Sequence, residues 1–477
     1  MAPLVQAPHV VLLASPGAGH VVPAAELASR LAVHHGCTVT VITYTNLSTA
    51  RHASALASLP RHVTTTALPE VSVDDLPADA CIETRIFTVV RRTLPQLRDL
   101  LGSLLGSPTG VSAFLTDMLC PAALAVAAEL GVPRYVFFSS NLMCLASLLY
   151  TPTLARTTTC DCRDLPEPIL LPGCVPLHGA DLVDPVQDRA NPVYPLMTEL
   201  GLDYLRADGF LVNTFDAMED ETLVAFKQLS DKGVYPPAYA VGPFVQPCSG
   251  EAANDTCIGW LDDQPDGSVV YVCFGSGGTL SSEQTAELAA GLEASKQRFL
   301  WVVRFPSNKD RSASYFGTTG HDDDPLTYLP VGFLKRTKGT GLAVPLWAPQ
   351  VEVLNHPAVG GFVSHCGWNS ALEAVAAGVP ILAWPLFAEQ RMNAVMLSSE
   401  RVGVALRPNA RDDGSVVPRE EVAAAVRELM SGEKGTAART KACELRLASE
   451  TASAPGGPQH QALAAVVGKW KQGLAKP

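Results

Sequence analysis

The chain has 477 residues, of which 47% are hydrophobic and 17% charged, and this balance predicts a folded protein of two or more domains. Its net charge of −12 disfavours nucleic acid as a partner, because a basic surface would be needed to meet phosphate. The 12 cysteines lack the paired CxxC spacing of a zinc site, and no apolar run reaches the roughly 18 residues of a membrane span. We therefore expect a reduced, cytoplasmic, monomeric protein without stable membrane insertion.

The first elements predicted along the chain are a strand at 9–14, a glycine loop that ends at His20, and a helix that follows it. This order is the opening of a doubly wound α/β domain. The loop lacks the third glycine of a dinucleotide fingerprint, because Val22 stands in that place. The stretch after the next strand, 38–44, has no acid for a ribose either, so a nicotinamide dehydrogenase is disfavoured.

An acidic residue is predicted at a second strand end of the same sheet. Helices are expected at 51–60 and 83–105, and strands at 111–117, 132–140 and 209–215. Asp117 ends one of these strands and His20 follows another, so a shared sheet edge can bring the two together. His20 could then take up a proton while Asp117 fixes the tautomer of the imidazole. Asp117 could instead cap the helix that begins near Pro121.

Two domains are predicted on either side of a polar stretch that contains Pro and Gly. We expect an N-terminal domain at 1–242, a linker at 243–256, and a C-terminal domain at 257–455. The second domain opens with its own strand, glycine loop and helix, where Ser281 and Gln284 form a capping-box pattern. Two such openings predict an α/β protein with two Rossmann-like domains that face each other across a cleft.

The most informative stretch runs from Trp347 to Gln390. Its apolar run GGFVSH predicts a buried strand, and a turn leads from there into a helix for which Ser370 fits the N-cap and Glu373 the capping box. A strand that turns into a helix offers backbone N–H groups and a positive dipole end to a phosphate.

Side chains around this turn suit a nucleotide sugar. His365, Asn369 and Ser370 can donate hydrogen bonds to phosphate oxygens. The aromatic faces of Trp347 and Trp368 can stack on a nucleobase, and the acceptor-rich pair Glu389 and Gln390 suits sugar hydroxyls.

The stretch resembles, end to end, the signature box of the plant family 1 UDP-glycosyltransferases, with Trp at its start, Pro-Gln next, HCGWNS in the middle and an acid–Gln pair at its end. The likeness extends over nearly the whole chain and is greatest to the hydroquinone (arbutin-forming) and phenol glucosyltransferase group. It implies the GT-B fold, with 456–477 forming a helix that returns to the N-terminal domain. It also implies inverting, metal-independent transfer of glucose from UDP-glucose, as donor substrate and without a cofactor, to the hydroxyl of a small phenolic or similar aromatic acceptor, giving a β-D-glucoside.

The resemblance also assigns roles to individual residues. It implies His20 as the base and Asp117 as its orienting acid. The residues implied for UDP-sugar binding are Ser276, Trp347, Ala348, Gln350, His365, Gly367, Trp368, Asn369, Ser370, Glu373, Glu389 and Gln390. Those that stand where relatives line their acceptor pocket are Glu83, Ile86, Leu119 and Tyr315. No metal ligand is expected, and the Asp322–Asp324 run is interpreted as solvated.

Three other functions stay open on the sequence alone. The first two are transfer to nitrogen and transfer to carbon of an aromatic acceptor, which only product analysis separates from transfer to oxygen. The third is a catalytically silent protein that binds a UDP-sugar, and the presence of both His20 and Asp117 argues against it.

Overall fold

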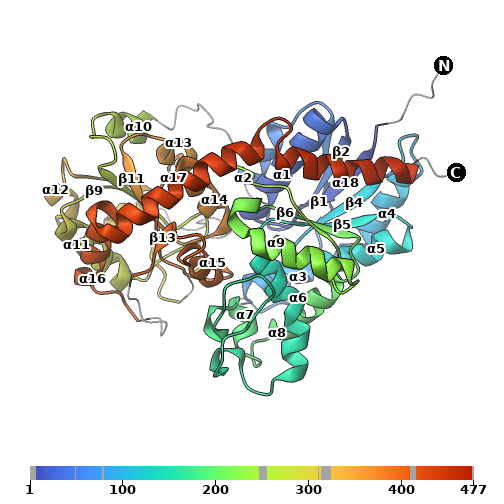
Figure 1. Ribbon diagram of the computed structural model, residues 1–477, viewed down its shortest axis with the longest axis horizontal. Coiled ribbons are helices and arrows are strands. Elements are labelled where there is room, and N and C mark those ends of the chain that lie inside the picture. The colour runs from blue at the N-terminus through green and yellow to red at the C-terminus, as the bar shows by residue number, and fades with distance from the viewer. Residues whose placement is uncertain are drawn as a thin grey trace. The chain divides into compact units, whose positions relative to one another are not determined.

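The computed structural model describes residues 7–48, 50–77, 80–245, 255–309, 311–312, 324–408 and 415–474 (Figure 1). The chain divides into two compact units. Unit 1 consists of Met1–Pro176, Pro185–Phe244 and Thr451–Pro477, and unit 2 of Leu177–Asp184 and Val245–Glu450. Each unit holds one parallel sheet with helices, which is the Rossmann-like arrangement of the GT-B fold.

Unit 1 is built on a seven-stranded parallel sheet of order β3-β2-β1-β4-β5-β6-β7. Its strands are β1 His9–Leu13, β2 Thr38–Tyr44, β3 Val63–Leu68, β4 Ala113–Asp117, β5 Arg134–Phe138, β6 Gly209–Val212 and β7 Ala238–Ala240. Its helices are α1 Ala18–His35, α2 Ala50–Ala57, α3 Ile82–Arg92, α4 Leu94–Leu105, α5 Leu124–Glu129, α6 Leu142–Thr157, α8 Tyr194–Tyr204, α9 Asp216–Asp231 and α18 Pro458–Leu474, with short 3₁₀ turns η1 Pro121–Ala123 and η2 Cys162–Asp164. The central strands β1 and β4 are buried along their whole length, as strands covered by helices on both faces must be.

Several elements of unit 1 differ from the sequence-based prediction, among them a strand and a helix whose differences have a clear physical reason. The edge strand β3 was not predicted, because its interior is Thr-rich and only its first and last residues, Val63 and Leu68, are buried. The single helix predicted at 83–105 is two helices that meet at Thr93, next to Pro95. A proline has no backbone N–H for the preceding turn, so it starts a helix more readily than it continues one.

Unit 2 is built on a six-stranded parallel sheet of order β10-β9-β8-β11-β12-β13. Its strands are β8 Val269–Cys273, β9 Arg298–Val303, β10 Gly341–Pro345, β11 Val359–Ser364, β12 Ile381–Ala383 and β13 Ala405–Leu406. Its helices are α10 Asp255–Asp262, α11 Ser282–Ser295, α12 Phe333–Arg336, α13 Gln350–Leu354, α14 Trp368–Ala377, α15 Gln390–Leu397, α16 Arg419–Ser431 and α17 Glu433–Ser453, with 3₁₀ turns η3 Gly179–Asp181 and η5 Pro325–Tyr328. Two helices, α7 (Asp184–Gln187) and α17, contain a point at which the chain passes from one unit to the other. Ser281 caps α11 as predicted, since its hydroxyl accepts from Gln284 N at 3.0 Å.

The units do not follow the order of the chain. Leu463, Val466 and Trp470 of α18 belong to the hydrophobic core of unit 1. The segment Leu177–Asp184, which the sequence places inside the N-terminal domain, belongs to unit 2. Its last residue explains this, because Asp184 accepts a hydrogen bond from Ala388 N at 2.7 Å.

The division between the units also falls later than the predicted linker start. Phe244 is 5% exposed, and its ring lies 5.8 Å from that of Phe137, so it is part of the unit 1 core. The predicted linker end at 256 falls inside α10.

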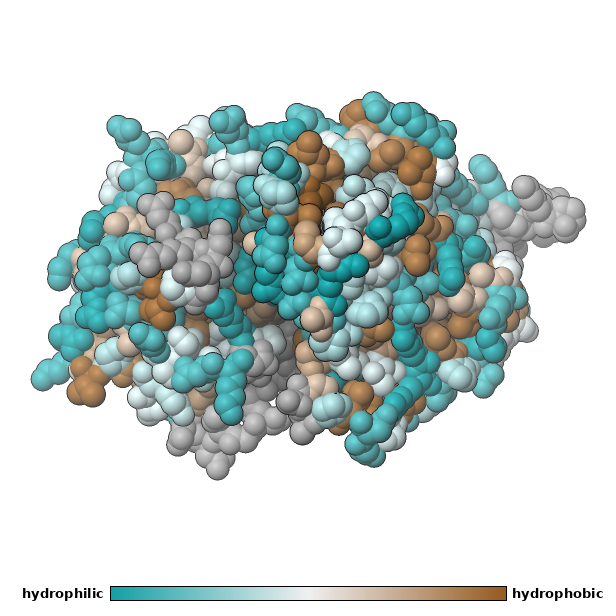
Figure 2. All heavy atoms as spheres, turned by 90° about the horizontal axis from the view of Figure 1, so that it is seen from below, coloured by the Kyte–Doolittle hydropathy of each residue, from teal (hydrophilic) through white to brown (hydrophobic). Residues whose placement is uncertain are grey.

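No described helix has both the length and the hydropathy that a membrane span requires. On the face drawn in Figure 2, hydrophobic residues form separate groups among hydrophilic ones. Single exposed residues such as Leu170 and Val331 are ordinary for a protein surface.

Candidate active site

The first candidate group is a histidine–aspartate pair in unit 1. His20 lies in the first turn of α1, which Gly17 opens with a φ of 111°, and Asp117 is the last residue of β4. Strands β1 and β4 are adjacent, with Leu13 opposite Thr116, so both residues lie at one sheet edge. His20 Nδ1 and Asp117 Oδ2 are 3.0 Å apart, and the side chains are 14% and 0% exposed. The structure therefore brings together the two residues that the sequence predicts to meet.

Asp117 holds its place through a second contact. Its Oδ1 accepts a hydrogen bond from Leu119 N at 3.0 Å, while the turn η1 is capped by Cys120. Ser139, directly after β5, places its hydroxyl 3.3 Å from His20 Nδ1. Burial, and next the negative charge of Asp117, raise the pKa of the Cys120 thiol well above its ordinary value, so the thiol stays neutral.

This geometry sets the chemistry of the ring. A carboxylate is only an acceptor, so the neutral imidazole keeps its proton on Nδ1 and its lone pair on Nε2. Asp117 also stabilises the imidazolium that forms once Nε2 accepts a proton. His20 is thus suited to be a general base, and its ring is partly exposed to solvent.

The second candidate group is the turn between β11 and α14 in unit 2. The helix begins at Trp368 with Gly367 as its N-cap, so the prediction that Ser370 is the N-cap was wrong. The physical reason is the backbone of the turn, since Cys366 adopts a φ of 63° and brings the chain into the helix early. Asn369 and Ser370 consequently lie within the first turn, whose N–H groups have no partner inside the helix.

His365 is packed between two glycines at this turn. A Cβ atom on either Gly275 or Gly367 would lie 2.4 Å from His365 Nε2, so both positions need glycine. The side chain is 9% exposed, and its buried Nδ1 has no hydrogen-bond partner among the described residues. Burial first, and the charge of Arg304 second, lower the pKa of His365 to about 4. The ring is therefore a neutral hydrogen-bonding group at neutral pH.

A hydrogen-bonded cluster lies beside the same helix. Gln350 Nε2, at the start of α13, donates to Ser370 Oγ at 2.8 Å and to Glu373 Oε2 at 2.6 Å. Trp347, three residues before α13, is 49% exposed, whereas Ala348 is buried. The exposed indole of Trp347 can stack on a flat ring. The side chains of Gln350 and Glu373 can exchange hydrogen bonds with the hydroxyls of a polyol.

Trp368 and Gln390 offer a ligand other groups than the stacking face and the acceptor oxygen that the sequence analysis expected of them. Trp368 is 3% exposed, so its ring does not offer the open face that Trp347 has. Gln390 Oε1 accepts from Leu386 N at 2.8 Å and from Phe387 N at 3.1 Å, which leaves its amide N–H groups rather than its oxygen for a ligand. Ser276 and Glu389 are both partly exposed.

The acceptor residues predicted by resemblance lie on neighbouring segments of unit 1. Glu83 and Ile86 are on α3, which packs against η1, and Leu119 lies just before η1. Ile86 is 2% exposed, so its side chain is packed inside unit 1. Tyr315 lies outside the described residues.

No group of three or more His, Cys, Asp or Glu side chains that could hold a metal ion occurs within the described ranges. Of the run Asp322–Asp324, only Asp324 is described, and its Oδ1 caps η5 by accepting from Leu326 N at 2.9 Å.

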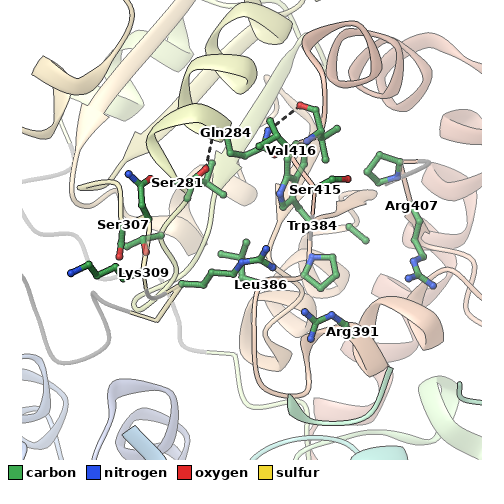
Figure 3. Close-up of a pocket in the computed structure, with 18 residues that line it drawn as sticks. Ser281, Gln284, Ser307, Lys309, Trp384, Leu386, Arg391, Arg407, Ser415 and Val416 are labelled. Carbon is green, nitrogen blue, oxygen red and sulfur yellow. Dashed lines mark hydrogen bonds between the residues drawn. The ribbon is translucent and has the colours of Figure 1, made fainter. Parts of the chain in front are cut away.

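The pocket drawn in Figure 3, of about 330 Å³, belongs to unit 2 but contains none of the residues predicted for the donor. Gln284 forms one wall, where it exchanges hydrogen bonds with the backbone of Val417. Four cationic side chains line the pocket: Lys309, Arg311, Arg391 and Arg407. Asp184 binds Arg391, and Asp181 lies 3.9 Å from Arg407, so the segment Leu177–Asp184 offsets part of this charge.

One charged residue at the carboxyl end of a unit 2 strand was missed by the sequence reasoning. Arg304 directly follows β9, in the stretch FLWVVRF. The signal was available, because a charged residue at the carboxyl end of an apolar strand lies at the edge where ligands bind, which is the reasoning that found Asp117.

Comparison with known proteins gives matches over nearly the whole chain. Residues 259–439 match the family described as UDP-glucoronosyl and UDP-glucosyl transferase. The chain is 45% identical to hydroquinone glucosyltransferase of Rauvolfia serpentina, over 98% of this chain and 99% of that protein.

Two solved structures are similar in both sequence and fold. One is Phytolacca americana UGT2 complexed with UDP-2fluoro-glucose and pterostilbene, with a TM-score of 0.87 and 43% identity over 97% of this chain and 100% of that chain. The other is a UDP-glucosyltransferase from Polygonum tinctorium capable of glucosylating indoxyl, in complex with 3,4-dichloroaniline. Its TM-score is 0.89 and its identity 42%, over 98% of this chain and 99% of that chain.

Proposed function

The chain belongs to the UDP-glycosyltransferase family and is a UDP-glucose-dependent glucosyltransferase, and we propose that it transfers glucose with inversion to the hydroxyl of a small phenolic acceptor. The observation that carries the proposal is the 3.0 Å contact between His20 Nδ1 and Asp117 Oδ2. A phenol must lose its proton as it attacks the anomeric carbon, and a positioned imidazole can take it up. Direct attack on an α-linked sugar nucleotide gives a β-glucoside.

Unit 2 supplies the groups that hold the donor. Trp347 stacks on the uracil, and Gln350 and Glu373 bind the ribose hydroxyls. The turn of His365, Asn369 and Ser370 binds the diphosphate, with Ser276 of the glycine loop beside it. Glu389 and Gln390 hold the sugar, which Gln390 can do through its amide N–H groups. Transfer then requires the anomeric carbon to come within reach of an acceptor at His20.

We propose that the transfer needs no divalent metal. The leaving diphosphate gains negative charge in the transition state, and fixed donors aimed at that charge can stabilise it. A helix N-terminus and the neutral His365 are such donors. Chelation with EDTA should leave the rate unchanged.

The acceptor class is supported by the relatives. Hydroquinone, indoxyl and pterostilbene, named for the similar proteins, share a hydroxyl on a flat aromatic system. A second candidate, transfer to an aromatic amine, is favoured by the 3,4-dichloroaniline bound to the Polygonum tinctorium relative. Both acceptors could use the same base.

The test is incubation of the purified chain with UDP-glucose and a panel of hydroquinone, indoxyl, coniferyl alcohol, a chlorophenol and a chloroaniline, with products identified by mass and NMR. A β-O-glucoside is the expected product. An α-glucoside would exclude inversion, and UDP release without any glycoside would exclude transfer to these acceptors.

A further inference from the structure

Arg304 lies between the two parts of the candidate donor site. Strand β9 pairs with β8, where Trp301 is opposite Val272, and with β10, where Val303 is opposite Pro345. These registers place Arg304 at the carboxyl end of β9, near the start of the glycine loop that follows β8 on one side. On the other side lies Leu346, whose N–H donates to Val303 O at 2.8 Å. It therefore stands at the carboxyl edge of the sheet, between the phosphate turn and the exposed indole.

The side chain points away from the hydrophobic core. Phe299, Trp301 and Val303 of β9 belong to the core cluster of unit 2, and side chains alternate along a strand. Arg304 therefore lies on the opposite face of the sheet, the face of Tyr271 and Cys273 on β8.

The described residues give the guanidinium no counter-ion. Its Nε is buried without a hydrogen-bond partner among them, and none of their carboxylates forms an ion pair with it. Burial lowers the pKa of Arg304, but a guanidinium stays protonated at neutral pH. A half-buried cation whose Nε is fully buried is costly unless an anion meets it, so this arrangement indicates an anionic ligand.

A second buried atom, again without a partner within the described ranges, lies nearby. Nδ1 of His365 is this atom, and His365 packs against Gly275 of the glycine loop. Burial and the charge of Arg304 keep His365 neutral, with a pKa of about 4. The two residues therefore differ in role, because neutral His365 can donate a hydrogen bond and Arg304 carries a permanent positive charge.

We infer that Arg304 is a further donor-binding residue, which supplies the fixed positive charge that meets the diphosphate of the nucleotide. The identity of the nucleotide rests on the proposed function. Uridine shares the nucleobase and ribose with UDP and lacks the phosphates, so comparing the two isolates the contribution of the charge.

The test measures binding of UDP by calorimetry, and of uridine by displacement of UDP, to the full chain and to the variants Arg304→Gln and Arg304→Lys. We expect Arg304→Gln to weaken UDP by about ten- to a hundredfold, with uridine unchanged, because a hydrogen bond to a charged group is lost. Arg304→Lys should restore part of the affinity for UDP. The control is Arg298→Gln, at the amino end of the same strand, which should bind UDP normally.

Ligand-free stability separates binding from a structural role. Because the described residues offer the guanidinium no ion pair to lose, Arg304→Gln should not lower the midpoint of thermal unfolding without ligand. A lower midpoint, equal losses for UDP and uridine, or unchanged UDP affinity would each overturn the inference, as would absence of UDP binding by the wild type. UDP binding that depends on Arg304 in a protein that forms no glycoside would support the inference while excluding the proposed function.

Discussion

His20 Nδ1 lies 3.0 Å from Asp117 Oδ2, although 97 positions separate the two residues in the chain. The contact exists because β1 and β4 are neighbours in the sheet and end at the same edge. It fixes the imidazole tautomer before any substrate arrives, so the base needs no rearrangement in order to act.

Replacing His20 by alanine should reduce the rate of glucoside formation by about 10²- to 10⁴-fold, the usual contribution of a general base. Affinity for UDP should not change, because His20 belongs to unit 1. The measurement is the initial rate with hydroquinone beside UDP titration. His34→Ala, an exposed position on the same helix, is the matched control and should keep full activity. Equal rates for His20→Ala and the wild type would exclude His20 as the base.

The variant Asp117→Asn should fold and still be slow. Its amide oxygen can accept a hydrogen bond from Leu119 N as the carboxylate does. The neutral amide, however, no longer fixes the tautomer of the imidazole or stabilises the imidazolium. We expect kcat to fall by about 10²- to 10⁴-fold, with KM for UDP-glucose unchanged. A full pH–rate profile distinguishes this role, since loss of the negative charge should lower the apparent pKa of the base. A profile of unchanged shape and height would contradict it.

His365 should make the stability of the protein depend on pH. Its pKa is about 4 in the folded chain, against the ordinary histidine value of 6.5, so between these values the unfolded state binds the extra proton. The contribution of neutral His365 to the free energy of unfolding is therefore fully present above pH 6.5 and is lost as the pH falls toward 4. From pH 7 to pH 5 the loss should be about 2 kcal/mol. Chemical denaturation at both pH values should show a smaller loss in His365→Gln, and equal losses would contradict burial of a neutral ring.

The variant Gly275→Ala should weaken UDP by about tenfold or more, because its Cβ would lie 2.4 Å from His365 Nε2 and displace a phosphate donor. Its φ of +74° adds backbone strain. Gly267→Ala separates the two effects, since Gly267 has a φ of +63° with nothing within 4 Å of the added atom. The control should lose some stability and keep its UDP affinity. Equal UDP affinities in both variants would show that displacement of His365 is unimportant.

Replacing Trp347 by alanine should weaken UDP and uridine alike, by about ten- to a hundredfold, because one base stack contributes about 1–3 kcal/mol. The ring is 49% exposed, so the thermal midpoint without ligand should barely change. Trp347→Phe keeps an aromatic face and should retain most of the affinity. Selective loss of UDP with uridine unchanged would place the indole away from the base.

Sequence patterns located the residues whose position depends on strand ends. His20, Asp117 and His365 each follow an apolar run, and a parallel sheet gathers such residues at one edge. Arg304 obeys the same rule, but the glycine loops nearby carry a stronger sequence signal than a single charged residue at a strand end.

The misplaced features depend on tertiary contacts that no local pattern reports. The helix cap at Gly367 instead of Ser370 follows from the left-handed backbone of Cys366. Gln390 Oε1 is not open to a ligand, because it accepts a hydrogen bond from the backbone N–H of Leu386 in a turn. The assignment of Leu177–Asp184 to unit 2 follows from the contact of Asp184 with a loop more than two hundred residues away.

That last feature limits how the enzyme can be engineered. The chain passes between the units after Pro176, Asp184, Phe244 and Glu450, so neither unit is a contiguous piece of sequence. A chimera joined only near Phe244 would combine the unit 1 sheet of one parent with α18 of the other. It would also combine the unit 2 sheet of that other parent with Leu177–Asp184 of the first. Donor halves can be exchanged between relatives only when Leu177–Asp184 and α18 each come from the same parent as the rest of the unit to which they belong.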